Sequence, residues 1–134
     1  MDITDPSYAE GRVYDFQGED KIASHLLQTF PYQGELQKIT YETKEFSAVC
    51  PFSGLPDIAY VSIVYIPAQK IVELKSLKYY FVSYRNVGIY QEHATNRIYR
   101  DLKKVLEPKR LVVKTIYNTR GGIDAACEID SDQT

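Results

Sequence analysis

The alternation of apolar and polar residues predicts two strands in the first half of the chain. From Glu35 to Val49 apolar residues alternate with polar ones, which indicates a strand with an irregularity near residues 40–44. The segment Ile58 to Ile66 is almost wholly apolar and rich in β-branched residues, as is typical of a strand covered on both faces. Proline and glycine in residues 50–57 force a turn between the two strands, so this half of the chain predicts a hairpin.

The spacing of apolar residues becomes helical in the middle of the chain. One amphipathic helix is predicted from about Leu74 to Asn86, because apolar residues recur there every three or four positions. A second and stronger apolar stripe predicts a helix from about Tyr90 to Leu106, and Pro108 lies just beyond its end.

Two further strands are predicted near the end of the chain, Lys109 to Asn118 and Ile123 to Ile129, joined by the turn Thr119 to Gly122. The order is therefore β-β-α-α-β-β. An antiparallel four-stranded sheet with both helices on one face, an α+β fold, is the economical arrangement of these elements. Because such a sheet leaves its edges unpaired, we expect the edges to pair between subunits in a ring or barrel.

The first part of the chain, residues 1–34, shows little periodicity apart from a possible short helix around Lys21 to Phe30. We expect it to be an extension packed on one domain, residues 35–134, which carries the function. Its isolated His25 is expected on the surface. The stretch from Met1 to Phe30 is too acidic and polar for a signal peptide, and no apolar run approaches membrane-spanning length.

Composition narrows the choice of partners. The net charge of the 134 residues is −2, so the chain lacks the strong positive field that gathers polyanions, and we expect neither a nucleic-acid nor a membrane partner. Cys50 and Cys127 lie far apart and match no zinc spacing, which predicts no metal site and a reducing, cytoplasmic setting. Twelve tyrosines without tryptophan favour amphipathic contact surfaces in pockets or between subunits.

A cysteine and an aspartate share the predicted first turn. Cys50 lies at the end of a strand, and Asp57 follows seven residues later across a loop rich in proline and glycine. A carboxylate placed close to the sulfur could serve as its base and later as a general acid. The ordinary alternatives are a buried, inert cysteine and an aspartate that only forms the turn.

Charged residues on the later elements could bind anions or a heterocycle. Lys75 and Lys78 are three residues apart on one helix, and Arg120 precedes two glycines, so these cations could bind phosphate. A solvated helix face is the more ordinary explanation of the lysines, and a hairpin turn explains the glycines without a ligand. Glu73 and Glu92 could accept paired hydrogen bonds from a guanine-like ring, or simply complement helix dipoles.

The segment ELKSLKYY, Glu73 to Tyr80, resembles the signature of the NADPH-dependent 7-cyano-7-deazaguanine reductases, the nitrile reductases of queuosine biosynthesis. The likeness covers about Phe46 to Ile123, because three further segments match that family in order and spacing: Cys50-Pro51 with Pro56-Asp57, Tyr84-Arg85-Asn86 and Arg120-Gly121-Gly122. The resemblance implies the tunnelling fold, with active sites between subunits and a homo-oligomer, a decamer of two stacked pentamers.

The resemblance also implies a role for each matched residue. Cys50 would add to the nitrile carbon to form a thioimide, and Asp57 would protonate the nitrile nitrogen. Two NADPH molecules would then reduce the thioimide and the resulting imine to 7-aminomethyl-7-deazaguanine. Binding of the deazaguanine base would fall to Val72, Glu73, Leu74, Gln91 and Glu92, and binding of the cofactor phosphates to Lys75, Lys78 and Arg120.

Two positions depart from that family. Gln91 stands where a histidine is common, and because glutamine cannot change charge near neutral pH, no proton role is carried over to it. Ala94 stands where some members have a second cysteine, so no protective disulfide is expected for Cys50. The competing hypotheses are an archaeosine-forming amidinotransferase that acts on tRNA with ammonia, and a non-catalytic tunnelling-fold protein that binds a pterin or purine.

Overall fold

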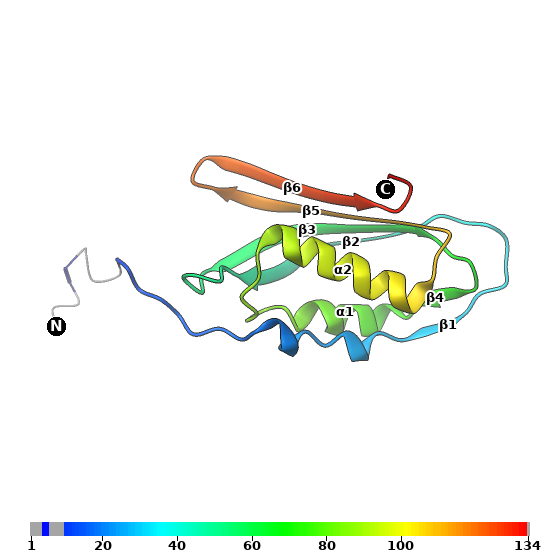
Figure 1. The fold of residues 1–134 in the computed structure, drawn as a ribbon, viewed down its shortest axis with the longest axis horizontal. Helices are drawn as coiled ribbons and strands as arrows, with labels where there is room; N and C mark the ends of the chain where they lie inside the picture. Colours follow the sequence, from blue (N-terminus) through cyan, green and yellow to red (C-terminus); the bar gives the residue numbers. More distant parts are fainter. Residues whose placement is uncertain (1–3, 6–9, 134) are drawn as a thin grey trace.

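The computed structural model describes residues 4–5 and 10–133, and its main feature is a four-stranded antiparallel sheet in the order β2-β3-β5-β6. The strands are β2 (Ile39–Val49), β3 (Pro56–Ile66), β5 (Arg110–Arg120) and β6 (Ile123–Asp130). Helices α1 (Leu74–Val82) and α2 (Gln91–Leu106) cover one face of the sheet (Figure 1). The predicted order of elements, and the placement of both helices on one face, are confirmed.

The predicted irregularity of the first strand is also confirmed, because the pairing of β2 with β3 shifts register between Thr43 and Phe46. The first helix is shorter than predicted and ends at Val82. The Ser83 hydroxyl donates a 2.6 Å hydrogen bond to the carbonyl of Tyr80, and the Ser83 amide bonds the carbonyls of both Tyr79 and Tyr80. These local bonds turn the chain away from the helix axis, and Tyr84 remains buried beyond the helix end.

The helix expected around Lys21 to Phe30 is wrong. This segment contains two 3₁₀ turns, η2 (Glu19–Lys21) and η3 (Ser24–Leu26), and the short strand β1 (Thr29–Pro31), which pairs antiparallel with β4 (Lys70–Val72). The amides of Ala23 and Gln28 bond the hydroxyls of Ser83 and Ser76, at 2.9 and 3.0 Å. A continuous helix would need those amides for its own backbone bonds, so packing against the α1 region replaces it.

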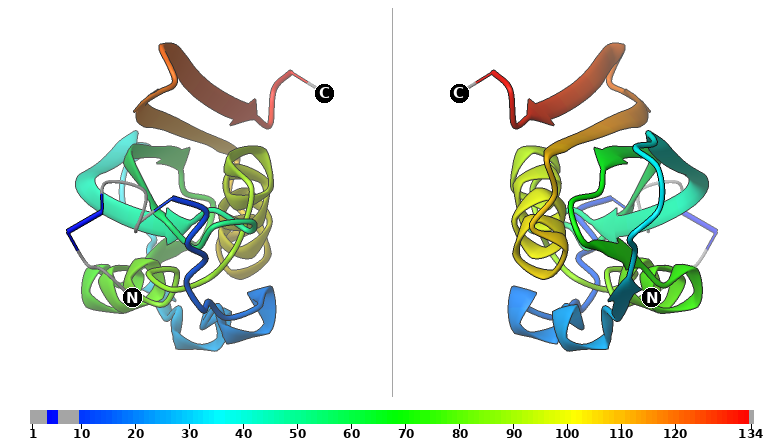
Figure 2. Two further views of the ribbon diagram at one scale, coloured as in Figure 1. Left: turned by 90° about the vertical axis from the view of Figure 1, so that its left-hand side faces the viewer. Right: turned by 90° about the vertical axis from the view of Figure 1, so that its right-hand side faces the viewer.

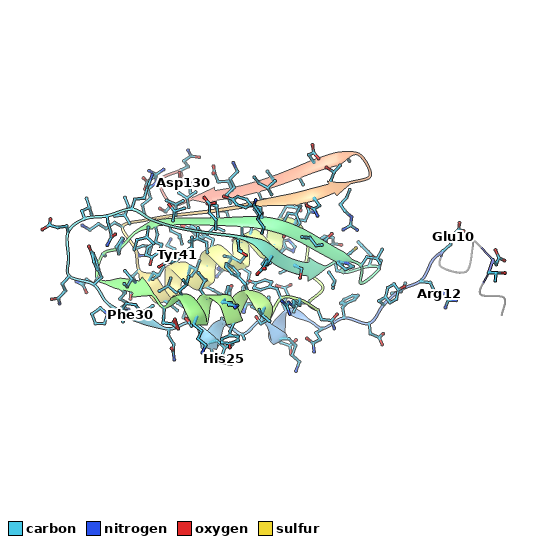
Figure 3. The ribbon with its side chains drawn as sticks, turned by 180° about the vertical axis from the view of Figure 1, so that it is seen from behind. Glu10, Arg12, His25, Phe30, Tyr41 and Asp130 are labelled. Atoms are coloured by element: carbon cyan, nitrogen blue, oxygen red, sulfur yellow. The ribbon has the colours of Figure 1, made fainter. Side chains whose placement is uncertain are left out.

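His25 lies exposed on η3, as predicted (Figure 3).

The two faces of β3 differ in burial, which corrects the expectation that this strand is covered on both sides. The residues that face the helices are buried: Ala59, Val61, Ile63 and Tyr65. The opposite face is only partly covered within one chain, and Ile58 on β3 and Ile116 on β5 are 46% and 41% exposed. Both helices lie on the first face, so an apolar strip of the sheet is left without a cover (Figure 2).

A polar network crosses the interior between the helices. The hydroxyl of Tyr80 donates to Asp101 at 2.7 Å and also bonds the hydroxyl of Tyr84 at 2.7 Å. Arg97 donates to the same carboxylate oxygen of Asp101 at 2.8 Å. Burial raises the pKa of both tyrosines, so they remain neutral hydroxyls. The network therefore satisfies the polar groups that α1 and α2 bring inside.

Replacing Asp101 by alanine is expected to lower the free energy of unfolding by about 2 kcal/mol, because it leaves the buried hydroxyl of Tyr80 and the guanidinium of Arg97 without their acceptor. The matched control is Asp132→Ala, since Asp132 is a mostly exposed carboxylate that pairs with Arg110. Loss of that surface pair is expected to cost less than about 1 kcal/mol. Urea unfolding of both variants tests this, and equal losses would contradict it.

Two groups of turns and helix starts lie towards opposite ends of the sheet in Figure 1. The β2–β3 turn, the β5–β6 turn and the start of α2 gather at one end, while β4 and the start of α1 lie at the other.

Among the helices of the described residues, none has the length and apolar character needed to cross a membrane.

Candidate active site

Cys50 comes directly after β2 and is held by a tight turn. Its amide donates to the carbonyl of Leu55 at 2.9 Å, and its own carbonyl accepts from the amide of Gly54 at 2.9 Å. Gly54 has a φ of 72°, a left-handed conformation that favours glycine. These bonds hold the half-exposed sulfur at the strand end, as the sequence predicted.

The turn also favours the thiolate form of this cysteine. The backbone N–H groups of Ser53 and Phe52, in that order of effect, lower the pKa of Cys50. Burial and the charge of Asp57 raise it, but by less. A thiol with a lowered pKa that solvent can reach is the usual setting of a reactive cysteine, and not of a structural one.

Asp57 lies near the start of β3, where its side chain is 10% exposed. Burial raises the pKa of Asp57, and the guanidinium of Arg120 offsets part of that rise. Arg120 donates to the carboxylate of Asp57 and, at 3.0 Å, to the carbonyl of Pro56. The structure therefore brings three predicted site residues together, and it gives the carboxyl a pKa closer to neutral than an ordinary aspartate.

Tyr117 belongs to this cluster, although sequence reasoning gave it no functional role. It is 5% exposed on β5, opposite Ala59 of β3. Burial raises its pKa, and the charges of Asp57, Cys127 and Glu92 add to the rise. Tyr117 is thus within electrostatic range of the carboxyl, the β6 thiol and the first turn of α2. The alternating pattern placed Tyr117 on one face of its strand, but only the strand register shows what it faces.

The remaining predicted site residues form a second group, at the start of α1. We call it the lysine end; it consists of Val72, Glu73, Leu74, Lys75 and Lys78. The first group, the thiol end, consists of Cys50, Asp57, Tyr117 and Arg120, with Gln91 and Glu92 at the start of α2. In Figure 1 the start of α1 lies away from the β2–β3 turn, the β5–β6 turn and the start of α2, so the two groups belong to different parts of the chain.

The lysine end borders a cavity of about 680 Å³ between α1 and the edge of β2. Its apolar lining includes Phe46, Leu77 and Phe81, and its rim carries Lys75, Lys78 and Arg85 together with three glutamates. One of these, Glu73, caps α1 by accepting from the amides of Lys75 and Ser76, at 2.6 and 3.0 Å. Val72 is buried, and its amide already donates to the hydroxyl of Tyr65 at 3.1 Å.

An extended N-terminal segment, residues 12–18, packs on the turn that carries Cys50, and we call it the strap (Figure 3). The Tyr14 amide donates to the carbonyl of Ser53 at 2.8 Å. Gln17 bonds the chain between the helices, where its carbonyl accepts from Gly88 at 2.9 Å. The strap has no regular periodicity, so its contacts were not predictable from the pattern.

Replacing Gly54 by alanine is expected to displace the strap, because the new methyl carbon would lie 2.3 Å from the Tyr14 carbonyl oxygen. Gly11→Ala is the matched control: Gly11 has nearly the same φ, 71°, but nothing within 4 Å of the added carbon. Gly11→Ala therefore measures the cost of the left-handed backbone alone, which is about 1 kcal/mol. We expect Gly54→Ala to cost at least about 2 kcal/mol in urea unfolding and to change the rate of Cys50 alkylation. Equal effects in the two variants would exclude a role for the contact.

Within residues 4–5 and 10–133, no three His, Cys, Asp or Glu side chains are placed to hold a metal ion. Both cysteines are free thiols.

Two named relatives are similar over most of the chain. A Thermotoga maritima protein named NADPH-dependent 7-cyano-7-deazaguanine reductase is 59% identical over 124 residues, covering 92% of this chain and 90% of the relative. A Caldicellulosiruptor bescii protein of the same name is 54% identical over 114 residues, covering 84% and 87%. These relatives confirm the resemblance found in the segment from Glu73 to Tyr80.

A solved structure and a family model agree with these relatives. The crystal structure of the archaeosine synthase QueF-Like in the apo form is 21% identical, covers 77% of this chain and 99% of its own, and superposes with a TM-score of 0.65. This likeness confirms the predicted α+β tunnelling fold. The family model described as QueF-like protein matches residues 56–134, more than half of the chain. The chain therefore belongs to the QueF-like protein family.

Proposed function

We propose that this chain is an oxidoreductase that uses NADPH to reduce the nitrile of 7-cyano-7-deazaguanine to the aminomethyl group, a step of tRNA queuosine biosynthesis. The observation that carries the proposal is the reachable thiol of Cys50, with its lowered pKa, beside the buried carboxyl of Asp57. The names of the two similar relatives support both the reaction and the cofactor.

The first step needs only Cys50, Asp57 and substrate. The thiol gives its proton to the carboxylate of Asp57 as the sulfur attacks the nitrile carbon. A carbon–sulfur bond forms, one π bond of the nitrile opens, and its electron pair takes the proton from Asp57 to give a thioimide. Asp57 ends the step ionised, as it began.

NADPH fits the lysine end. Lys75 and Lys78 are exposed, form no ion pair with another described residue, and border a cavity with an apolar lining. Ammonium groups of this kind suit phosphates as point charges, so we propose that both lysines hold the cofactor phosphates. When bound, NADPH supplies the hydrides that reduce the thioimide and then the imine, two per turnover.

We propose that each active site forms between two copies, where the lysine end of one meets the thiol end of the next. The uncovered apolar face around Ile58 and Ile116 and the two free sheet edges, β2 and β6, support such an assembly. The decamer of two stacked pentamers is the proposed form. Mixing inactive Cys50→Ala with inactive Lys75→Ala/Lys78→Ala protomers should restore activity, because some shared sites then contain both intact ends. Absence of recovery after verified subunit exchange would exclude shared sites.

The proposed reaction is tested by following NADPH oxidation with 7-cyano-7-deazaguanine, together with the intact mass of the protein. We expect oxidation of two NADPH per product and a covalent adduct on Cys50. Product formation on tRNA with ammonia, without NADPH oxidation, would instead support the amidinotransferase hypothesis, which the net charge of −2 disfavours. Binding without an adduct would support the non-catalytic alternative.

We also propose the cytoplasm as the compartment, since two free thiols are typical of a reducing setting. Residues 35–134 are the proposed catalytic domain, with residues 1–34 as its extension.

A further inference from the structure

Arg120 contacts the carboxylate that the proposed reaction uses, although the family resemblance assigned it to the cofactor phosphates. We propose that Arg120 is a positioning residue that keeps Asp57 ionised before the attack, so that the carboxylate can accept the proton of Cys50. This inference rests on the proposed function and deepens it. It gives Arg120 a part in adduct formation, which takes place without NADPH.

The contact is specific in its geometry. One nitrogen, Nη1 of Arg120, donates both to the carboxylate of Asp57 and to the carbonyl of Pro56, two neighbouring acceptors at the start of β3. Arg120 ends β5, and the following glycines, with φ of 58° and 77°, reverse the chain into β6. No atom lies within 4 Å of a carbon added at either glycine, so the turn itself is open. The two acceptors at the start of β3 orient the guanidinium.

The carboxylate needs this cation because it is nearly buried. The side chain of Asp57 is 10% exposed, and a carboxylate withdrawn from water without a partner takes up a proton. The titratable groups that face it are Cys50 from the turn and Tyr117 from β5, and Tyr117 is in turn influenced by Glu92 of α2 and Cys127 of β6. None of these is a cation. Among the described residues, Arg120 is the cation whose charge acts on Asp57.

Removal of the guanidinium has a predictable effect on proton transfer. With Arg120 absent, burial alone acts on the carboxyl, and Asp57 keeps its own proton up to a higher pH. A protonated carboxyl cannot accept the thiol proton, so adduct formation must slow on the acid side. At high pH the carboxyl is ionised with or without the arginine, and the rates must converge.

The test measures the rate of adduct formation with 7-cyano-7-deazaguanine, without NADPH, from about pH 5 to about pH 9. In wild type the rate should rise with pH on the acid side of this range, and we call this rise the acid limb. In Arg120→Met we expect the acid limb to lie about one pH unit higher, which makes the rate at a given acidic pH about tenfold slower. Arg120→Lys should restore most of the wild-type limb, because it returns the charge. The matched control is Arg110→Met, at the other end of the same strand, where Arg110 pairs with Asp130 and Asp132. The acid limb of Arg110→Met should lie at the same pH as in wild type.

Each outcome separates the alternatives. An unmoved limb in folded Arg120→Met, combined with weaker NADPH binding, would overturn the inference and leave Arg120 as a cofactor ligand only. A rate reduced equally at every pH, without rescue by Arg120→Lys, would show a structural role and also overturn it. Failure of the wild-type protein to form any adduct would refute the proposed function itself.

Discussion

Cys50→Ala is expected to abolish both the covalent adduct and NADPH oxidation while the protein stays folded. The sulfur supplies the bond on which the whole reaction depends, so we expect turnover to fall by at least about 10⁴-fold. Cys50 is only half-buried at the end of β2, and its turn is held by backbone bonds that alanine keeps. The free energy of unfolding should therefore change by less than about 1 kcal/mol. Intact mass, NADPH absorbance and urea unfolding measure the three quantities.

Cys127→Ala is the matched control for this experiment. Cys127 is the other half-buried free thiol, and it lies on β6, opposite Thr115. Its removal should leave the adduct and turnover close to the wild-type values. Turnover that survives in Cys50→Ala and is lost in Cys127→Ala would reverse the assignment of the nucleophile.

The sheet and the helices were predictable because each buries one face whose period appears in the sequence. Alternation located β2, β5 and β6, and a spacing of three and four located α1 and α2. The apolar run also located β3, but not its coverage, since such a run does not tell a strand that is buried on both faces from one that is buried on a single face. The pattern failed before Thr29, where hydroxyls of Ser76 and Ser83 determine the backbone path.

The thiol end was only partly predictable, for a geometric reason. Cys50 and Asp57 flank one short turn, so their proximity follows from the local sequence. The contact of Arg120 with Asp57 joins residues 63 positions apart, and it depends on the register of β3 with β5. The separation of the thiol end from the lysine end depends on the directions of α1 and α2, which no motif encodes.

Asp57→Asn is expected to lower turnover by about 10²- to 10³-fold, because the amide cannot take the thiol proton or deliver it to the nitrile nitrogen. The shape of the side chain is kept, and its oxygen can still accept from Arg120. The adduct should therefore form slowly, unlike in Cys50→Ala, where it cannot form. Single-turnover mass measurements distinguish the two variants, and a loss of less than tenfold would contradict a proton-transfer role for Asp57.

The same variant should reveal what the ionised carboxylate costs the fold. Burial raises the pKa of Asp57 above its ordinary value of 3.8, so the folded protein binds this proton more tightly than the unfolded chain does. The stability contributed by Asp57 is then fully present below the ordinary value and is lost as pH rises through the folded pKa. Asparagine does not titrate, so the stability of Asp57→Asn relative to wild type should increase with pH across this window. Urea unfolding at about pH 4 and about pH 7.5 measures it. A relative stability that falls with rising pH would mean that Arg120 outweighs burial, and that Asp57 is held ionised too strongly to act as the proton donor.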